Sequence, residues 1–81
     1  MKLDWNCNSL ITTGRVVRVS DEGQGYDASI PDDMTIDDAI EAFENGYDFG
    51  DYVGEIQCCA TILQDNEELE SKHFTLDNSE S

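Results

Sequence analysis

One helix decides the fold of this chain, and its sequence is TIDDAIEAFENG at residues 35–46. Apolar residues recur there at helical spacing and form one stripe, made of Ile36, Ala39, Ile40 and Phe43. Thr35 is a preferred N-terminal cap, and Gly46 suits the left-handed conformation that often ends a helix. The pattern predicts an amphipathic helix whose apolar stripe packs on a core.

Segments with a period of two residues flank this helix on both sides. They predict strands over residues 9–19, 26–30, 52–63 and 73–76. Pro31 ends the second of them, because proline cannot donate to a strand ladder. We expect an α+β fold, a four-stranded antiparallel sheet with one helix packed on one face, in the order strand-strand-helix-strand-strand.

The length of the chain fits a single domain over residues 1–81. Residues 1–8 show no period and are expected to be irregular, and residues 77–81 to be a frayed tail. Residues 64–70 are rich in acids and are predicted to be a loop.

Charge is the strongest compositional signal. Nineteen Asp and Glu face four Lys and Arg, which gives a net charge of −15. Direct binding of nucleic acid or of an anionic membrane is disfavoured, since both need basic patches. A soluble domain needs a net charge of only about 2–8 in magnitude, so the excess indicates a positively charged partner surface.

Other sequence signals favour a cytoplasmic location. No apolar run approaches the length of a membrane span, and the first residues lack the apolar core of a signal peptide. The three cysteines, Cys7, Cys58 and Cys59, do not form a disulfide framework, which suits a reducing compartment.

The acids are concentrated on the predicted helix. Asp37, Glu41, Glu44 and Asp48 fall on the face opposite the apolar stripe, with Asp38 beside them. No Lys or Arg lies between Arg18 and Lys72, so nothing within the helix neutralises this face. Further acids surround it at Asp27, Asp32, Asp33, Asp51 and Glu55. Of these, we expect Asp32, Asp33 and Asp51 to bind a basic protein surface together with the helix acids.

Three aromatic residues follow the helix, at Tyr47, Phe49 and Tyr52. Buried aromatic side chains often dominate the binding energy at the centre of an interface. We therefore include these residues in the candidate interface, although aromatic residues at this position could equally cap the sheet and the helix end.

Other site chemistries are poorly supported. One histidine and three cysteines do not give the spacing of a zinc site, and the acids do not follow the order of a calcium loop. No phosphate-binding glycine loop is present. We expect neither an enzyme nor a bound cofactor.

The chain resembles small, acidic, phage-encoded inhibitors, namely anti-CRISPR proteins and anti-restriction DNA mimics. Besides size and charge, the local segment Ala42–Tyr47 is similar to a stretch of a Cas9-inhibiting anti-CRISPR family. The resemblance implies an inhibitor whose carboxylates imitate DNA phosphates and block target DNA binding by a CRISPR effector or a restriction enzyme of the host.

Two alternatives use the same charge. An immunity protein or antitoxin could neutralise a basic toxin such as a nuclease, or an adaptor domain could be acidic because its host is halophilic.

Overall fold

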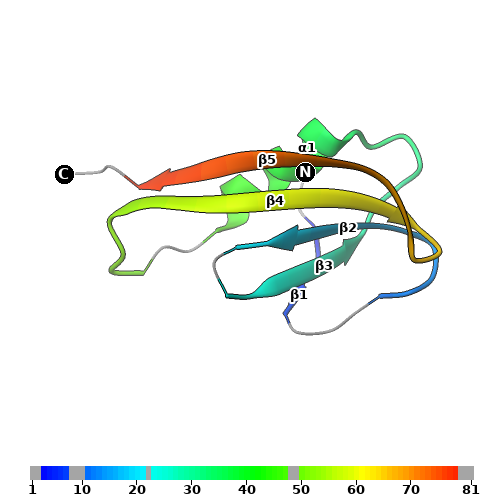
Figure 1. Cartoon of the computed structure of the whole chain (residues 1–81), viewed down its shortest axis with the longest axis horizontal. Helices are drawn as coiled ribbons and strands as arrows, with labels where there is room; N and C mark the ends of the chain where they lie inside the picture. Colours follow the sequence, from blue (N-terminus) through cyan, green and yellow to red (C-terminus); the bar gives the residue numbers. More distant parts are fainter. Residues whose placement is uncertain (1–2, 8–10, 22, 48–49, 79–81) are drawn as a thin grey trace.

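The computed structural model describes residues 3–7, 11–21, 23–47 and 50–78. The elements along the chain are β1 (Asn6–Cys7), β2 (Arg15–Ser20), β3 (Gly25–Ser29), α1 (Ile36–Gly46), β4 (Gly54–Gln64) and β5 (Glu67–Asn78). The strands form one sheet in the order β1-β3-β2-β4-β5, in which all neighbours are antiparallel (Figure 1). The predicted α+β class, the four predicted strands and their order around the helix are confirmed.

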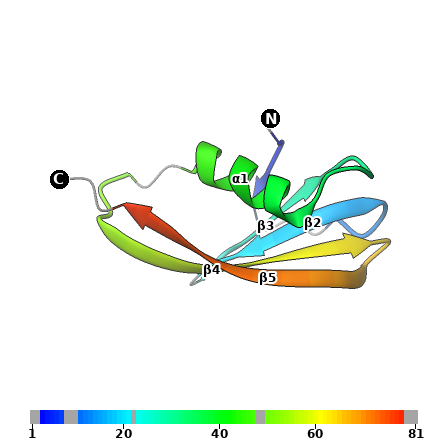
Figure 2. The same ribbon diagram turned by 90° about the horizontal axis from the view of Figure 1, so that it is seen from above.

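The core lies between α1 and one face of the sheet (Figure 2). The apolar stripe of the helix is buried, and so are alternate residues of the three central strands, namely Val17, Val19, Ala28, Cys58, Ala60 and Ile62. Because side chains alternate across a strand, this pattern leaves the intervening residues on a second sheet face that α1 does not cover. We call this second side the helix-free face.

Local sequence explains where α1 begins and ends. The backbone N–H of Asp38 donates to Oγ1 of Thr35 at 3.1 Å, so Thr35 caps the helix as predicted. The expected left-handed Gly46 is not found, because Gly46 is the last helical residue and the chain leaves through an extended Tyr47 with φ −78° and ψ 134°. Even so, the helix ends where the sequence predicted.

The second half of the sheet differs from the expected acidic loop. A turn at Asp65 and Asn66 joins β4 to β5 directly, and both residues have positive φ, 51° and 69°. Two consecutive residues of positive φ give the turn a twist that matches paired strands. The prediction of a loop over 64–70 was therefore wrong, and β5 extends from Glu67 through Asn78, which includes part of the expected tail.

The first half of the sheet also departs from expectation at its start. Of the strand predicted over 9–19, residues 9 and 10 lie outside the described ranges. Residues 11–14 are not in a strand, and β2 begins at Arg15. Gly14 precedes it with φ +78°, a conformation that interrupts a strand, and exchanges hydrogen bonds with Asp65. Segment 1–8, expected to be irregular, contributes the two-residue strand β1, which pairs with β3.

Candidate partner-binding surface

The exposed side of α1 carries the acids that the sequence predicted there. Asp37, Asp38, Glu41 and Glu44 are all exposed, whereas the opposite side of the helix is buried. Helical periodicity alone produces this separation, since residues three and four positions apart share a face. We call these four residues the α1 acidic face.

The turn before the helix extends this surface. Asp32 and Asp33 are exposed, while the next residue, Met34, is buried and its N–H donates to the carbonyl of Pro31 at 3.2 Å. Buried Met34 thus anchors the turn and holds the two carboxylates beside the N-terminal end of α1. The predicted grouping of Asp32 and Asp33 with the helix acids is consistent with this placement.

A shallow groove of about 350 Å³ lies on the same side of α1. Its lining consists of Asp33, Met34, Asp38, Glu41, Ala42 and Asn45. Three of these residues carry carboxylates, while Met34 and Ala42 are buried apolar residues. The groove therefore combines an acidic rim with apolar side chains.

One cation reaches the α1 acidic face from another element. Lys72 on β5 donates from Nζ to Asp37 Oδ1, although the two residues lie 35 positions apart. This cation comes from outside the helix, so it does not contradict the expectation that no residue of the helix neutralises the face. Both side chains are largely exposed, 52% and 70%, and an exposed ion pair contributes only about 0–1 kcal/mol. Asp38, Glu41 and Glu44 form no ion pair within the described ranges.

The other described cations are also engaged inside the molecule. Arg18 pairs with Asp27, and Arg15 donates from an Nη atom to the carbonyl of Met34 at 3.3 Å. Within residues 3–7, 11–21, 23–47 and 50–78, every Lys or Arg thus has a partner in the chain. The carbonyl of Met34 does not neutralise Arg15, but the exposed acids far outnumber the cations, so the surface is negative overall.

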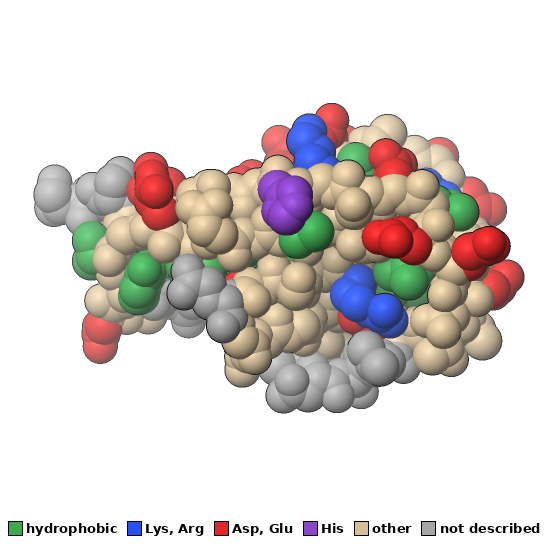
Figure 3. All heavy atoms as spheres, viewed as in Figure 1, with side chains coloured by type: hydrophobic (Ala, Val, Ile, Leu, Met, Phe, Trp, Pro, Cys, Tyr) green, Lys and Arg blue, Asp and Glu red, His purple; other side chains and the backbone are tan. Residues whose placement is uncertain are grey.

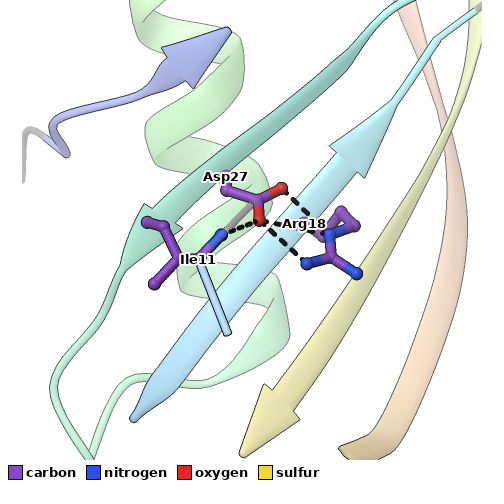
Figure 4. A network of polar contacts seen from close by, with 3 residues as sticks. All are labelled: Ile11, Arg18 and Asp27. Atoms are coloured by element: carbon purple, nitrogen blue, oxygen red, sulfur yellow. Dashed lines mark hydrogen bonds and ion pairs between the residues drawn. The ribbon is translucent and has the colours of Figure 1, made fainter. Parts of the chain in front are cut away.

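Asp27 belongs to the interior, although the sequence grouped it with the surface acids. It is 1% exposed and lies on the helix-free face, where it accepts hydrogen bonds from the Arg18 guanidinium at 2.9–3.2 Å (Figure 4). Its carboxylate also accepts the backbone N–H of Ile11 at 2.9 Å. The hydrogen bond to Asp27 raises the pKa of Arg18 above its ordinary value, partly opposed by desolvation, so the guanidinium stays charged at physiological pH.

The aromatic residues after the helix do not all face solvent. Tyr47 is half-buried and packs against Phe43, with ring centroids 5.5 Å apart, so it belongs to the core edge. Tyr52 and Asp51 are exposed, and the Tyr52 hydroxyl donates to the carbonyl of Glu55 at 3.1 Å. The predicted interface residues Asp48 and Phe49 lie outside the described ranges.

The Tyr52 ring lies against Gly54, whose φ is +134°. A Cβ at this glycine would come within 3.3 Å of the Tyr52 hydroxyl, and this φ is close to exclusive to glycine. We expect Gly54→Ala to lower the free energy of unfolding by about 1–3 kcal/mol, measured by urea denaturation. Gly23→Ala is the matched control, because a Cβ there meets nothing within 4 Å; equal stability of the two variants would contradict this account.

One surface feature was not anticipated. Trp5, Gln24, Tyr26, Phe43, Gly46 and Tyr47 line a second groove, of about 360 Å³. Trp5 packs edge-on against Phe43 with ring centroids 4.9 Å apart. These residues lie far apart in the sequence, so no local pattern relates them. Trp5, in the segment 1–8 that shows no period, could not be assigned to the groove from the sequence.

The helix-free face differs from the α1 side in where its acidic side chains lie (Figure 3). Most acidic side chains visible there lie toward its ends and margins. Its strand residues include Gln57, Cys59, Thr61, His73 and Thr75, in register across β4 and β5. In the described ranges, no group of three or more His, Cys, Asp or Glu is placed to hold a metal ion.

Comparison with known proteins adds no relative. No protein-family model matches the chain, and neither a curated protein nor a solved structure is significantly similar to it. The described part of the chain also contains no helix with the length and apolarity of a membrane span.

Proposed function

We propose that this protein is an inhibitor that binds the nucleic-acid-binding surface of a basic target protein and acts as a DNA or RNA mimic. The observation that carries the proposal is the α1 acidic face with its flanking turn. Exposed carboxylates are concentrated there, and the described cations are engaged elsewhere or, in the case of Lys72, on Asp37 alone.

The spacing of these carboxylates supports mimicry. Neighbouring side chains on one helix face have Cβ atoms about 5–6 Å apart, while each DNA strand presents one phosphate per about 3.4 Å of its axis. The α1 acidic face and a DNA strand therefore both present closely spaced negative charges. A groove lined by Arg and Lys would therefore attract this face, and salt would weaken the attraction.

The acidic groove beside α1 suits a guanidinium or ammonium group of such a target. Carboxylates of Asp33, Asp38 and Glu41 could accept charge-assisted hydrogen bonds. The apolar side chains of Met34 and Ala42 could contact the aliphatic stem of an Arg or Lys. This combination favours a protein side chain over a free metal ion as occupant.

Among basic targets, we propose a CRISPR effector complex first and a restriction enzyme second. Effector complexes hold the guide–target heteroduplex in a positively charged channel and read a short DNA motif with arginines. The exposed side of α1 would dock against such a channel while its apolar side stays packed on the sheet. Blocking the channel would prevent target DNA binding.

The test measures target DNA binding by purified CRISPR effector and restriction complexes while this protein is added. We expect one of them to lose its labelled DNA at about 50 mM salt. The affinity of this protein for that complex, measured without DNA, should be at least about tenfold weaker at about 200 mM salt. If no complex loses DNA at low salt, the proposal fails. Neutralisation of a toxin nuclease instead would favour an immunity protein, and folding only at high salt would favour adaptation to a halophilic host.

A further inference from the structure

The outer edge of β5 is a second surface suited to a partner. Among the described residues, β5 is the last strand in the sheet order and pairs only with β4, so no described strand lies along the other long side of its twelve residues (Figure 1). In an antiparallel edge strand, alternate residues direct both N–H and C=O away from the sheet. Such an edge can template the addition of another strand.

The backbone of this edge is available. Within the described ranges, the hydrogen bonds that β5 makes outside its ladder with β4 come from the side chains of Lys72, Thr75 and Asn78. Among the same residues, no turn, loop or cap hydrogen bond ends on the β5 backbone. The outward-facing amides and carbonyls thus remain for another strand.

The edge is also regular over most of its length. An irregularity in the pairing falls between Ile62 and Leu63, beyond which Glu70–Asn78 pairs residue by residue with β4. β5 contains neither proline nor glycine, and proline would remove a donor from the ladder. Nine consecutive residues can therefore hold an added strand in register.

The charges along β5 favour a basic strand as its partner. Exposed acids lie toward both ends of β5, at Glu67, Glu68, Glu70 and Asp77, and the charge of Lys72 is paired with Asp37. Opposite charges placed across neighbouring strands attract, and like charges repel. A second copy of this chain, which also carries a charge of −15, is disfavoured, and a basic strand is favoured.

We propose that the β5 edge binds an extended, basic polypeptide segment of a partner protein as a sixth strand. Main-chain hydrogen bonds would supply affinity, and Lys or Arg side chains beside the β5 acids would supply selectivity. This edge adjoins the α1 acidic face at the Lys72–Asp37 ion pair, but it contains none of the residues of that face. The proposal does not use the proposed function and can be tested independently of it.

The test uses two synthetic peptides of alternating Lys and Val, about eight residues long, at low salt. One has ordinary amides, and the other carries N-methyl groups on alternate amides, which removes donors without changing charge. We expect the ordinary peptide to bind, with NMR shift changes and new hydrogen-exchange protection at residues 70–78. The N-methylated peptide should bind at least about tenfold more weakly, because each lost main-chain bond weakens the added strand.

Two variants with equal change in net charge identify the surface. Glu70→Gln with Asp77→Asn should weaken binding of the ordinary peptide more than Asp38→Asn with Glu41→Gln. Equal binding of the two peptides, shift changes centred on α1, or no binding would overturn the proposal. So would self-association of the protein that produces the same protection without peptide.

Discussion

Replacing Asp27 with alanine is expected to lower the free energy of unfolding by about 3–5 kcal/mol, a large part of the stability of a small domain. The substitution leaves the Arg18 guanidinium and the Ile11 N–H without their common acceptor. Because the Arg18 side chain is 27% exposed and can partly rehydrate, the lower end of this range is the better expectation. Urea denaturation followed by the fluorescence of Trp5, the single tryptophan, measures the loss.

Two controls separate this network from a general effect of removing an acid. Asp33→Ala removes an exposed carboxylate and should change stability by no more than about 0.5 kcal/mol. Replacing both partners, with Arg18→Met and Asp27→Leu, should cost less than Asp27→Ala alone, because no charge is left unpaired. If Asp27→Ala is as stable as Asp33→Ala, the buried pair does not stabilise the fold as argued.

Neutralising the α1 acidic face is expected to reduce inhibition of the target by about 100-fold. The variant combines Asp38→Asn, Glu41→Gln and Glu44→Gln, and leaves Asp37 to its ion pair with Lys72. Fields from clustered charge raise association rates by about 10–1,000-fold, and these substitutions remove that contribution. The inhibition constant against target DNA binding, measured at low salt, tests the expectation.

A matched variant changes the net charge by the same amount elsewhere. Asp4→Asn, Glu55→Gln and Glu67→Gln neutralise three exposed acids outside α1. This variant should retain inhibition within about fivefold, since these three acids lie outside the proposed contact and salt screens exposed charges increasingly with distance. Equal loss in both variants would show that total charge, and not the α1 acidic face, determines binding.

The helix and its exposed acids could be predicted from the sequence because their signals are local. The apolar stripe, the Thr35 cap and the acids opposite the stripe all lie within eleven helical residues and one flanking position. The same holds for the hairpin of β2 and β3, since the two strands are separated by only four residues, 21–24. Alternation along β4 also groups Cys58, Ala60 and Ile62, which are buried together in the core.

The errors share a different cause, which is contact between distant residues. Asp27 alternates along its strand with core residues, so the sequence places it among the surface acids. The structure instead buries its carboxylate, which accepts hydrogen bonds from Arg18 and from Ile11, sixteen positions away. Strand β1 is only two residues long and exists through pairing with β3. The Lys72–Asp37 pair joins positions that no local pattern relates.

The acidic composition of residues 64–70 explains why the sequence predicts a loop where β5 begins. A run of acids is typical of loops, and the turn at Asp65 and Asn66 lacks the glycine that usually marks a two-residue hairpin. Asp and Asn adopt positive φ more readily than most residues, so they can form this turn. Acids expected in a loop consequently lie along an edge strand.

The most direct test of the central proposal is a competition measurement. The inhibition constant of this protein is determined at several concentrations of target DNA, with the effector complex that it inhibits. If α1 occupies the nucleic-acid groove, the apparent constant rises in proportion to DNA concentration and DNA bound in advance blocks the protein. An apparent constant independent of DNA concentration would contradict mimicry.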